Sequence, residues 1–295
     1  MQKDSKLCIL GTIILSHLNV EKASKFFYRN RLGKKLNLDN PTLFNEKLMW
    51  LKLNKYNFDP KIWKLVDKYE VREYLIKQGV SDKNLPKLLF RYDNVSDIDW
   101  EQLPSKFALK CTHGCGFNII CEDKSTMNKK ETLEKLNKWL NTKFGYRTAE
   151  THYMHQKPCI ICEEFIENNN NGFPWDYKIY CFNGIPKVIL VCTNRESGYK
   201  VHFFDENWNK LYLRDDQSND EIAKPVSFDK MLELSKNISK EFPFVRVDFY
   251  EQNGNPVIGE LTFTPSSCTA KYNEFGEKYL GDLLDLSNLK NGGNE

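Results

Sequence analysis

The sequence lacks an apolar run long enough to cross a bilayer. Residues 7–18 form an apolar stretch, but Gly11, Ser16 and His17 interrupt it, and a membrane-spanning helix needs about 20 apolar residues. Two lysines precede the stretch, as in a signal peptide, but no small-residue cleavage site follows. We therefore expect a buried N-terminal helix or strand. The sequence allows contact with a membrane but does not require it.

The sequence shows no basic block that would suggest nucleic acid as the main partner, and its cysteines are scattered. The 43 basic and 40 acidic residues leave a net charge of +3, which excludes nucleic acid as the main partner. Nine scattered cysteines, an odd number, predict a reducing compartment and a cytoplasmic protein. With 295 residues and 40% hydrophobic content, the chain can form one large domain or two ordinary ones.

Common nucleotide-binding and catalytic motifs are absent. The stretch FALKCTHGCGFNII lacks the Gly-Lys-Ser/Thr ending of a Walker A motif, and a strand rather than a Rossmann helix follows it. No Ser-His-Asp arrangement can be identified. Within this stretch Lys110 ends one strand, and Gly114 and Gly116 form the turn. Glycines let backbone N–H groups approach a phosphate, so a phosphate loop and a plain β-hairpin both fit.

A zinc site is disfavoured although cysteines are frequent near His113. The candidates are Cys111, Cys115, Cys121, Cys159 and Cys162. The last two are three residues apart in a predicted strand, so they point to opposite faces. His152 and His155 could share a helix face, but no acidic residue is placed to orient them, and we expect surface histidines.

Hydrophobic periodicity predicts an α+β fold in which helices and strands are partly segregated. Helices are expected within residues 20–64 (with Thr42 as an N-cap), 67–79, 131–143 and 227–242. Strands are expected at 106–111, 116–121, 159–166, 177–184, 186–194, 244–252 and 257–263. Polar composition predicts loops at 167–172 and 195–225, the second extended over a site.

The last two strands, in FVRVDFYEQNGNPVIGELTFTP, place acidic residues in apolar segments. A two-residue Asn-Gly turn would pair Asp248 with Gly259 and send Asp248 and Glu260 to opposite faces. A loop of odd length would pair Asp248 with Glu260, and Arg246 with Thr262. We expect the longer loop, because Pro256 is a poor ladder member. Facing carboxylates repel unless a cation lies between them, and hard oxygen ligands suit Mg²⁺. An exposed face with ordinary charges is the alternative.

Taken in order, these segments resemble the ATP-grasp superfamily, and more narrowly the TupA-like family of teichuronopeptide biosynthesis. The resemblance covers about residues 32–283. Its carrying segments are LGKKLNLDNPTLFNEKLMWLKL, VDKYEVREYL, LPSKFALKCTHGCGFNIICEDKS, ICEEFIE, DYKIYCFNG and the terminal hairpin. It implies two α+β lobes that clamp ATP, with an N-terminal helical extension. The boundaries we expect are 1–66 for the extension, 67–166 for the first lobe and 167–290 for the second lobe with the metal site.

The resemblance also implies roles for particular residues. It assigns Lys110, His113, Gly114, Cys115 and Gly116 to the phosphates, together with Arg72, which follows an Asp-Lys pair. Glu163, Glu164, Phe165 and Ile166 would form the adenine hinge, Asp176 would meet the ribose, and Lys178 would also bind the nucleotide. Asp248, Glu260 and Thr262 would hold Mg²⁺, with Arg246 on the transferred phosphoryl group and Arg195 on the substrate. Two positions depart from the usual pattern: Thr262 replaces a frequent Asn, and Cys115 a frequent Ser.

The implied activity is an ATP-dependent carboxylate–amine ligase that acts through an acyl phosphate. The family context suggests a uronic acid of a cell-surface polysaccharide, or its precursor, as the carboxylate and an amino acid or amino alcohol as the amine. A glycosyltransferase, a sugar or small-molecule kinase, and a non-catalytic nucleotide-binding module are the alternatives.

Overall fold

The computed structural model describes residues 5–166, 174–194 and 198–290. Helices are α1 (Lys6–Leu18), α2 (Val20–Leu32), α3 (Phe44–Asn54), α4 (Pro60–Leu65), α5 (Val71–Lys77), α6 (Lys129–Leu140), α7 (Phe228–Ser239), α8 (Glu274–Leu283) and α9 (Ser287–Lys290). Strands are β1 (Leu88–Tyr92), β2 (Phe107–Cys111), β3 (Asn118–Cys121), β4 (Ile160–Glu164), β5 (Asp176–Phe182), β6 (Ile185–Thr193), β7 (Lys200–Asp205), β8 (Lys210–Leu211), β9 (Phe244–Gln252) and β10 (Asn255–Thr262).

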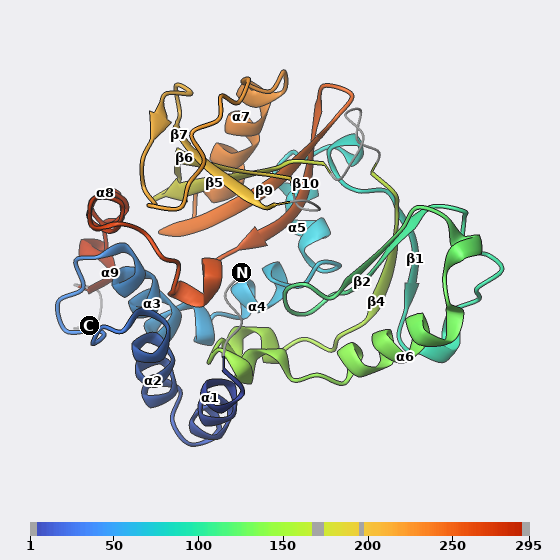
Figure 1. The fold of residues 1–295 in the computed structure, drawn as a ribbon, viewed down its shortest axis with the longest axis horizontal. Helices are drawn as coiled ribbons and strands as arrows, with labels where there is room; N and C mark the ends of the chain where they lie inside the picture. Colours follow the sequence, from blue (N-terminus) through green and yellow to red (C-terminus); the bar gives the residue numbers. More distant parts are fainter. Residues whose placement is uncertain (1–4, 167–173, 195–197, 291–295) are drawn as a thin grey trace.

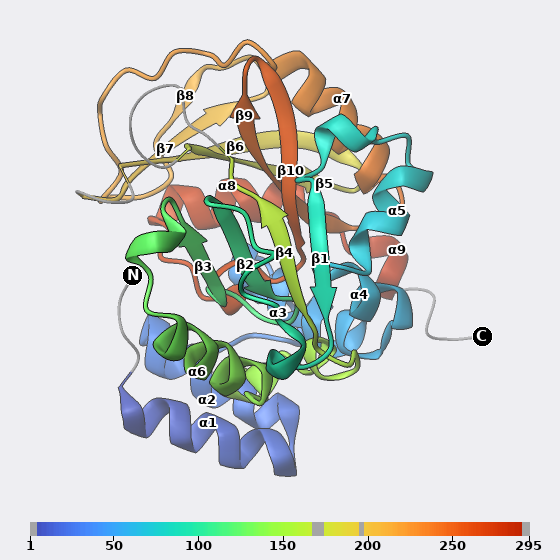
Figure 2. The same ribbon diagram turned by 90° about the vertical axis from the view of Figure 1, so that its right-hand side faces the viewer.

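Two antiparallel sheets organise the chain (Figures 1 and 2). The smaller sheet has the order β1-β4-β2-β3 and the larger the order β10-β9-β5-β6-β7-β8. Each has its own core. One is formed by residues between 92 and 162, and the other joins the larger sheet to side chains from the N-terminal helices. The α+β prediction is confirmed.

The larger sheet is covered on both faces, and strand alternation decides which side chains meet which layer. Cys181 of β5 contacts the backbone of Ser235 in α7. Its neighbours Tyr180 and Phe182 point the other way, toward Phe44 of α3, whose ring lies 6.3 and 5.8 Å from theirs. In α7, Phe228, Met231, Leu234 and Ile238 are buried at helical spacing. Burying each such side chain contributes roughly 1.5–3 kcal/mol.

The α3 face of this sheet changes character along the strands. Register pairs Phe182 with Phe244, then Tyr180 with Arg246, and then Lys178 with Asp248. Opposed residues in an antiparallel ladder lie on the same face. This face of the sheet is therefore aromatic where α3 covers it and charged at the pair formed by Lys178 and Asp248. A site can form at the charged end.

Several elements differ from the sequence predictions. Residues 200–205 and 210–211 are strands rather than part of a loop, because Val201, His202, Phe203 and Phe204 are all buried in the larger sheet. The helix expected from residue 67 begins at Val71, since the Asp67 carboxylate accepts the N–H groups of Tyr69 and Glu70 in a turn. Residues 167–172 lie outside the described residues.

Local capping and histidine burial also differ. Thr42 is not the N-cap of α3; Leu43 is, and the Glu46 carboxylate accepts the N–H groups of both residues. His152 is buried rather than on the surface, with its Nδ1 2.9 Å from Oδ1 of Asn57. His155 is exposed, as expected, and stacks on Trp63.

The N-terminal apolar run forms helix α1, which is one of the two forms predicted for it. The prediction that this run is buried is wrong. Leu7 and Leu18 of α1 are 81% and 79% exposed. Within the described residues, no helix has both the length and the apolar character needed to cross a bilayer.

Candidate functional site

The β9–β10 hairpin brings Asp248 opposite Glu260 by a different route from the predicted one. The turn is the two-residue Asn253-Gly254, with Asn255 opposite Gln252, so the longer loop is wrong and Pro256 does pair. The register then slips between Ile258 and Glu260, at Gly259, which is a β-bulge. The bulge lets Ile258 stay in the core while Glu260 faces the site. The expected pairings of Asp248 with Glu260, and Arg246 with Thr262, are confirmed.

Asp248 is the centre of a buried charge cluster. Its two carboxylate oxygens accept from Nε and Nη2 of Arg246 at 2.6 and 2.7 Å, and one of them also accepts from Nζ of Lys178 at 2.5 Å. Arg246 also donates to Oγ1 of Thr262 at 3.1 Å. The Asp248 side chain is only 6% exposed. A fork-shaped guanidinium holds a carboxylate in one orientation, so the cluster is preorganised.

Opposing effects set the protonation of this cluster. Burial acts to raise the pKa of Asp248, but the positive charges of Arg246 and Lys178 outweigh it and the pKa is lowered. For Lys178, burial acts to lower the pKa, yet the charge of Asp248 raises it overall. All three groups are therefore charged at neutral pH, with an excess of one positive charge.

Glu260 is held more loosely, by two cations at longer distance. Its Oε1 lies 3.8 Å from Nη2 of Arg246, and its Oε2 lies 3.8 Å from Nζ of Lys68. The Glu260 side chain is 33% exposed. Lys68 also donates to the carbonyl oxygen of Gly114 at 2.8 Å. Lys68 was not among the predicted site residues, because the Asp-Lys pair served only to locate Arg72.

The glycine loop after β2 faces this cluster from the smaller sheet. Gly114 and Gly116 have φ values of +81° and +75°, and a Cβ on Gly114 would lie 2.6 Å from the ring of Phe144. Only glycine fits such a position. The backbone N–H of Lys68 donates to the carbonyl oxygen of Thr112 at 3.1 Å, which ties the loop to the segment between α4 and α5.

A second set of basic side chains in the site surrounds the carboxylate of Glu163 in β4. Lys110 donates to Oε2 of Glu163 at 2.6 Å, and Nη1 of Arg72 lies 3.5 Å from Oε1. Burial acts to lower the pKa of Lys110, but Glu163 raises it overall. The Glu163 side chain thus pairs with two predicted phosphate ligands, a contact that the sequence analysis did not foresee.

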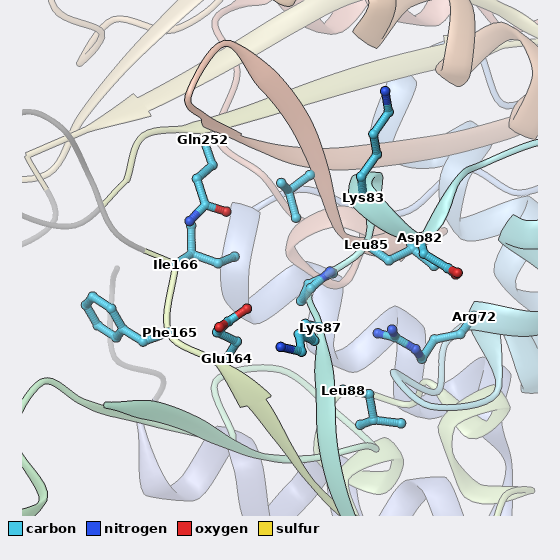
Figure 3. Close-up of a pocket in the computed structure, with 12 residues that line it drawn as sticks. Arg72, Asp82, Lys83, Leu85, Lys87, Leu88, Glu164, Phe165, Ile166 and Gln252 are labelled. Carbon is cyan, nitrogen blue, oxygen red and sulfur yellow. The ribbon is translucent and has the colours of Figure 1, made fainter. Parts of the chain in front are cut away.

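A pocket of about 560 Å³ lies beside these residues. Figure 3 shows Arg72, Lys87 and Glu164 extending into the same space, below Ile166 and Gln252. Phe165 and Val257 also line it. The pocket is of ordinary size for a small-molecule site. It unites four residues predicted for the nucleotide: Arg72, Glu164, Phe165 and Ile166.

Of three other predicted residues, two do not line the pocket and one lies outside the described residues. The His113 ring lies with Nε2 2.9 Å from the carbonyl oxygen of Thr142, so it does not turn toward the cluster. Asp176 is buried, with Oδ1 3.6 Å from Nζ of Lys178. Arg195 lies outside the described residues. The ribose role of Asp176 stays a prediction.

Strained backbone follows β10, which sequence reasoning did not find. Ser266, Ser267 and Cys268 have φ values of +50°, +53° and +58°. These φ values lie in the left-handed region of backbone conformation, where each non-glycine residue costs roughly 1–3 kcal/mol. Such strain is frequent at functional sites, and this segment lies four to six residues after the end of the strand that carries Glu260 and Thr262.

The carboxylates of the site are hard oxygen donors of the kind that Mg²⁺ prefers. This ion is commonly bound through one or two carboxylates plus substrate phosphates, and Asp248 and Glu260 supply two facing carboxylates. Glu260 is accessible to a metal ion. Asp248 is paired with Arg246 and Lys178, and the phosphate oxygens of a nucleotide could bind these two cations as well. The residues fit Mg²⁺ with a nucleotide. No group of three or more His, Cys, Asp or Glu residues suitable for a metal alone occurs in the described parts of the chain.

Two facing antiparallel sheets, a glycine loop on one and a carboxylate pair on the other define an ATP-grasp fold. The sequence profile of the TupA-like ATPgrasp family matches residues 46–285. The chain belongs to this family. Membership supports ATP-dependent carboxylate–amine ligation as the class of reaction.

Solved structures similar to the chain include two ligases and a synthase. D-alanine–D-alanine ligase from Bacillus anthracis, complexed with ATP, is 14% identical, with 77% of this chain and 67% of that chain covered and a TM-score of 0.47. N5-carboxyaminoimidazole synthase from Aspergillus clavatus is 13% identical, with 68% and 45% covered and a TM-score of 0.40. The ATP-grasp ligase PsnB, with Mg and ADP, is 15% identical, with 81% and 64% covered and a TM-score of 0.43. No curated protein sequence matches the chain.

Proposed function

We propose that the protein is an ATP-dependent ligase that joins a carboxylate to an amine through an acyl phosphate. The observation that carries this proposal is the facing pair Asp248 and Glu260, set among Arg246, Lys178 and Lys68 and opposite the glycine loop. An anionic carboxylate must approach an anionic phosphate in such a reaction. Preorganised positive charge lowers that barrier.

The chemistry has two steps. A carboxylate oxygen of the substrate attacks the γ-phosphorus of ATP, the bond to the β–γ bridging oxygen breaks, and ADP leaves with that electron pair. The amine nitrogen then attacks the carbonyl carbon of the acyl phosphate. Phosphate leaves, the nitrogen loses a proton, and an amide remains.

Each charged residue has a place in this scheme. Arg72 and Lys110 would bind phosphate oxygens beside the pocket, and Lys68 would do so beneath the glycine loop. Arg246 and Lys178 would hold the transferred phosphoryl group. Asp248 and Glu260 would hold Mg²⁺, which would screen charge on the nucleotide phosphates when bound, while Thr262 would keep Glu260 oriented through their 3.4 Å contact.

The family context suggests a substrate class. We propose a uronic acid, free or within a cell-surface polysaccharide precursor, as the carboxylate, and an amino acid or amino alcohol as the amine. Phe165 and Ile166 would contact the adenine, in the pocket that Gln252 closes from the hairpin.

The test is mass spectrometry of reactions that contain ATP, Mg²⁺ and a panel of uronic acids and amines. We expect ADP and an amide product only when a carboxylate and an amine are both present. Hydroxylamine added in place of the amine should trap the acyl phosphate as a hydroxamate. Glu260→Gln serves as the inactive control.

Other results would contradict the ligase. A stable phosphorylated product without hydroxamate would indicate a kinase. Calorimetric binding of UDP-sugars but not of ATP would indicate a glycosyltransferase. The chain contains an Asp-x-Asp sequence at residues 97–99, but there Asp97 accepts the N–H of Asn94 and Asp99 that of Glu101, as in ordinary turns.

A further inference from the structure

Helix α1 has its amphipathic faces reversed. Its polar side chains Thr12 and Ser16 are buried: Thr12 donates to the carbonyl oxygen of Cys8 at 2.8 Å, and Ser16 to that of Tyr146 at 3.1 Å. Four of its apolar side chains point outward: Leu7, Leu10, Ile14 and Leu18 are 81, 55, 53 and 79% exposed. Globular proteins normally turn the apolar face of a surface helix inward.

These four residues form one continuous stripe. Their spacings of three, four and four residues place them on the same face of a helix. The orientation of α1 is fixed by packing, because a Cβ on Gly11 would lie 2.9 Å from the ring of Phe26 in α2. Figures 1 and 2 both place this hairpin at one end of the molecule, with α1 outermost.

Positive charge is concentrated in the same hairpin. Residues 6–35 contain seven basic side chains and one acidic, a net charge of +6, although the whole chain carries only +3. The rest of the chain is therefore net acidic. On α2, Lys22, Lys25 and Arg29 are exposed at spacings of three and four residues, so they share a face.

We propose that the α1–α2 hairpin docks the protein on an anionic membrane surface. The α1 stripe would lie in the plane of the interface, and the basic residues would meet the lipid phosphates. An apolar face flanked by Lys and Arg is typical of interfacial helices, which lie on a bilayer without spanning it. A second copy fits less well, because a two-fold contact would bring the same +6 surface against itself. The proposal does not depend on the ligase activity.

The experiment is cosedimentation of the full chain with vesicles of phosphatidylcholine alone and of phosphatidylcholine mixed with an equal amount of phosphatidylglycerol. We expect binding to the anionic vesicles only, and loss of it in high salt. Each basic residue near such a surface contributes roughly fivefold to the partition coefficient. Lys22→Glu/Arg29→Glu should therefore reduce binding by more than about tenfold. Leu10→Asp/Ile14→Asp should abolish it.

Matched controls are available on other helices. Phe275→Asp changes an equally exposed apolar residue of α8, and Lys230→Glu/Lys236→Glu removes two exposed lysines of α7. Both should bind vesicles like the unchanged protein. Urea denaturation would check that all variants are folded.

Three results would overturn the proposal. One is no binding to anionic vesicles. Another is equal loss of binding in the control variants. The third is a concentration-dependent dimer in sedimentation that Leu10→Asp/Ile14→Asp disrupts while vesicles do not bind, which would assign the stripe to a second copy.

Discussion

Lys68 lies between the two sheets, with its Nζ 3.8 Å from Oε2 of Glu260 and 2.8 Å from the carbonyl oxygen of Gly114. Gly114 belongs to the loop of the smaller sheet, and Glu260 to the last strand of the larger one. One ammonium group thus joins the glycine loop to the carboxylate pair, and it is only 13% exposed.

Replacing this ammonium should weaken nucleotide binding. We expect Lys68→Met to raise the KM for ATP by roughly tenfold, because a charge-assisted contact to phosphate contributes about 1.5–3 kcal/mol. The free energy of unfolding should fall by only about 1 kcal/mol, for the lost bond to Gly114. Lys83→Met is the control, since Lys83 lines the pocket but points away from it (Figure 3). Equal effects of both variants would contradict this role.

Asp248 and Glu260 should respond differently to neutralisation. Asp248→Asn leaves Arg246 and Lys178 buried without their anion, which should lower the free energy of unfolding by about 3–5 kcal/mol. Glu260→Gln changes a third-exposed group and should cost less than about 1 kcal/mol. Both should reduce product formation by at least about 100-fold. Urea denaturation and initial rates measure the two effects. An Asp248→Asn variant as stable as the unchanged protein would show that the buried cations do not depend on this carboxylate.

His152 should make stability depend on pH. Burial, with the nearby charge of Lys52, lowers its pKa to about 3, against about 6.5 in the unfolded chain. Between these values the unfolded state binds the extra proton, so stability increases with pH by about 1.4 kcal/mol per unit. The contribution of His152 is constant above about pH 6.5.

The check is urea denaturation of the unchanged protein and of His152→Gln at several values between about pH 4 and 7. We expect the slope to be smaller in the variant, which retains a donor for Asn57. Other titrating groups are common to both proteins and cancel in the difference. Parallel slopes would mean that His152 is protonated in the folded state.

The strained segment after β10 offers a test by substitution. Ser266→Gly removes the unfavourable interaction of Cβ in the left-handed region and should raise the free energy of unfolding by about 0.5–1 kcal/mol. Ser266→Ala keeps the strain and removes only the hydroxyl. If the hydroxyl contacts a substrate, both variants lose activity; if the conformation itself matters, only the glycine variant does. A destabilised glycine variant would indicate that the segment is not strained.

Elements with strong periodicity could be predicted from the sequence, because burial and alternation decide them locally. The strands of the site and helix α7 are examples, and the Asn183-Gly184 turn has the positive φ values that such a turn needs. Strand β7 was missed because polar residues surround it, although Val201 to Phe204 is an apolar core segment.

Features set by tertiary contacts were not predictable in this way. The bulge at Gly259 adds one residue to β10 and so pairs Glu260 with Asp248. The type of turn between the two strands does not determine such a bulge. Lys68 becomes a site residue only because the chain folds back under the glycine loop. The reversed faces of α1 contradict the rule that apolar side chains turn inward, so a pattern-based prediction fails there.

The distribution of thiols has a practical consequence. Of the nine cysteines, all of which lie in the described residues, eight are buried and only Cys115 is exposed. Cys115 stands between the two loop glycines. A maleimide dye or nitroxide would therefore label the native chain at one position, in the glycine loop that we propose binds phosphate. Fluorescence or paramagnetic resonance could then follow nucleotide arrival without any engineered cysteine.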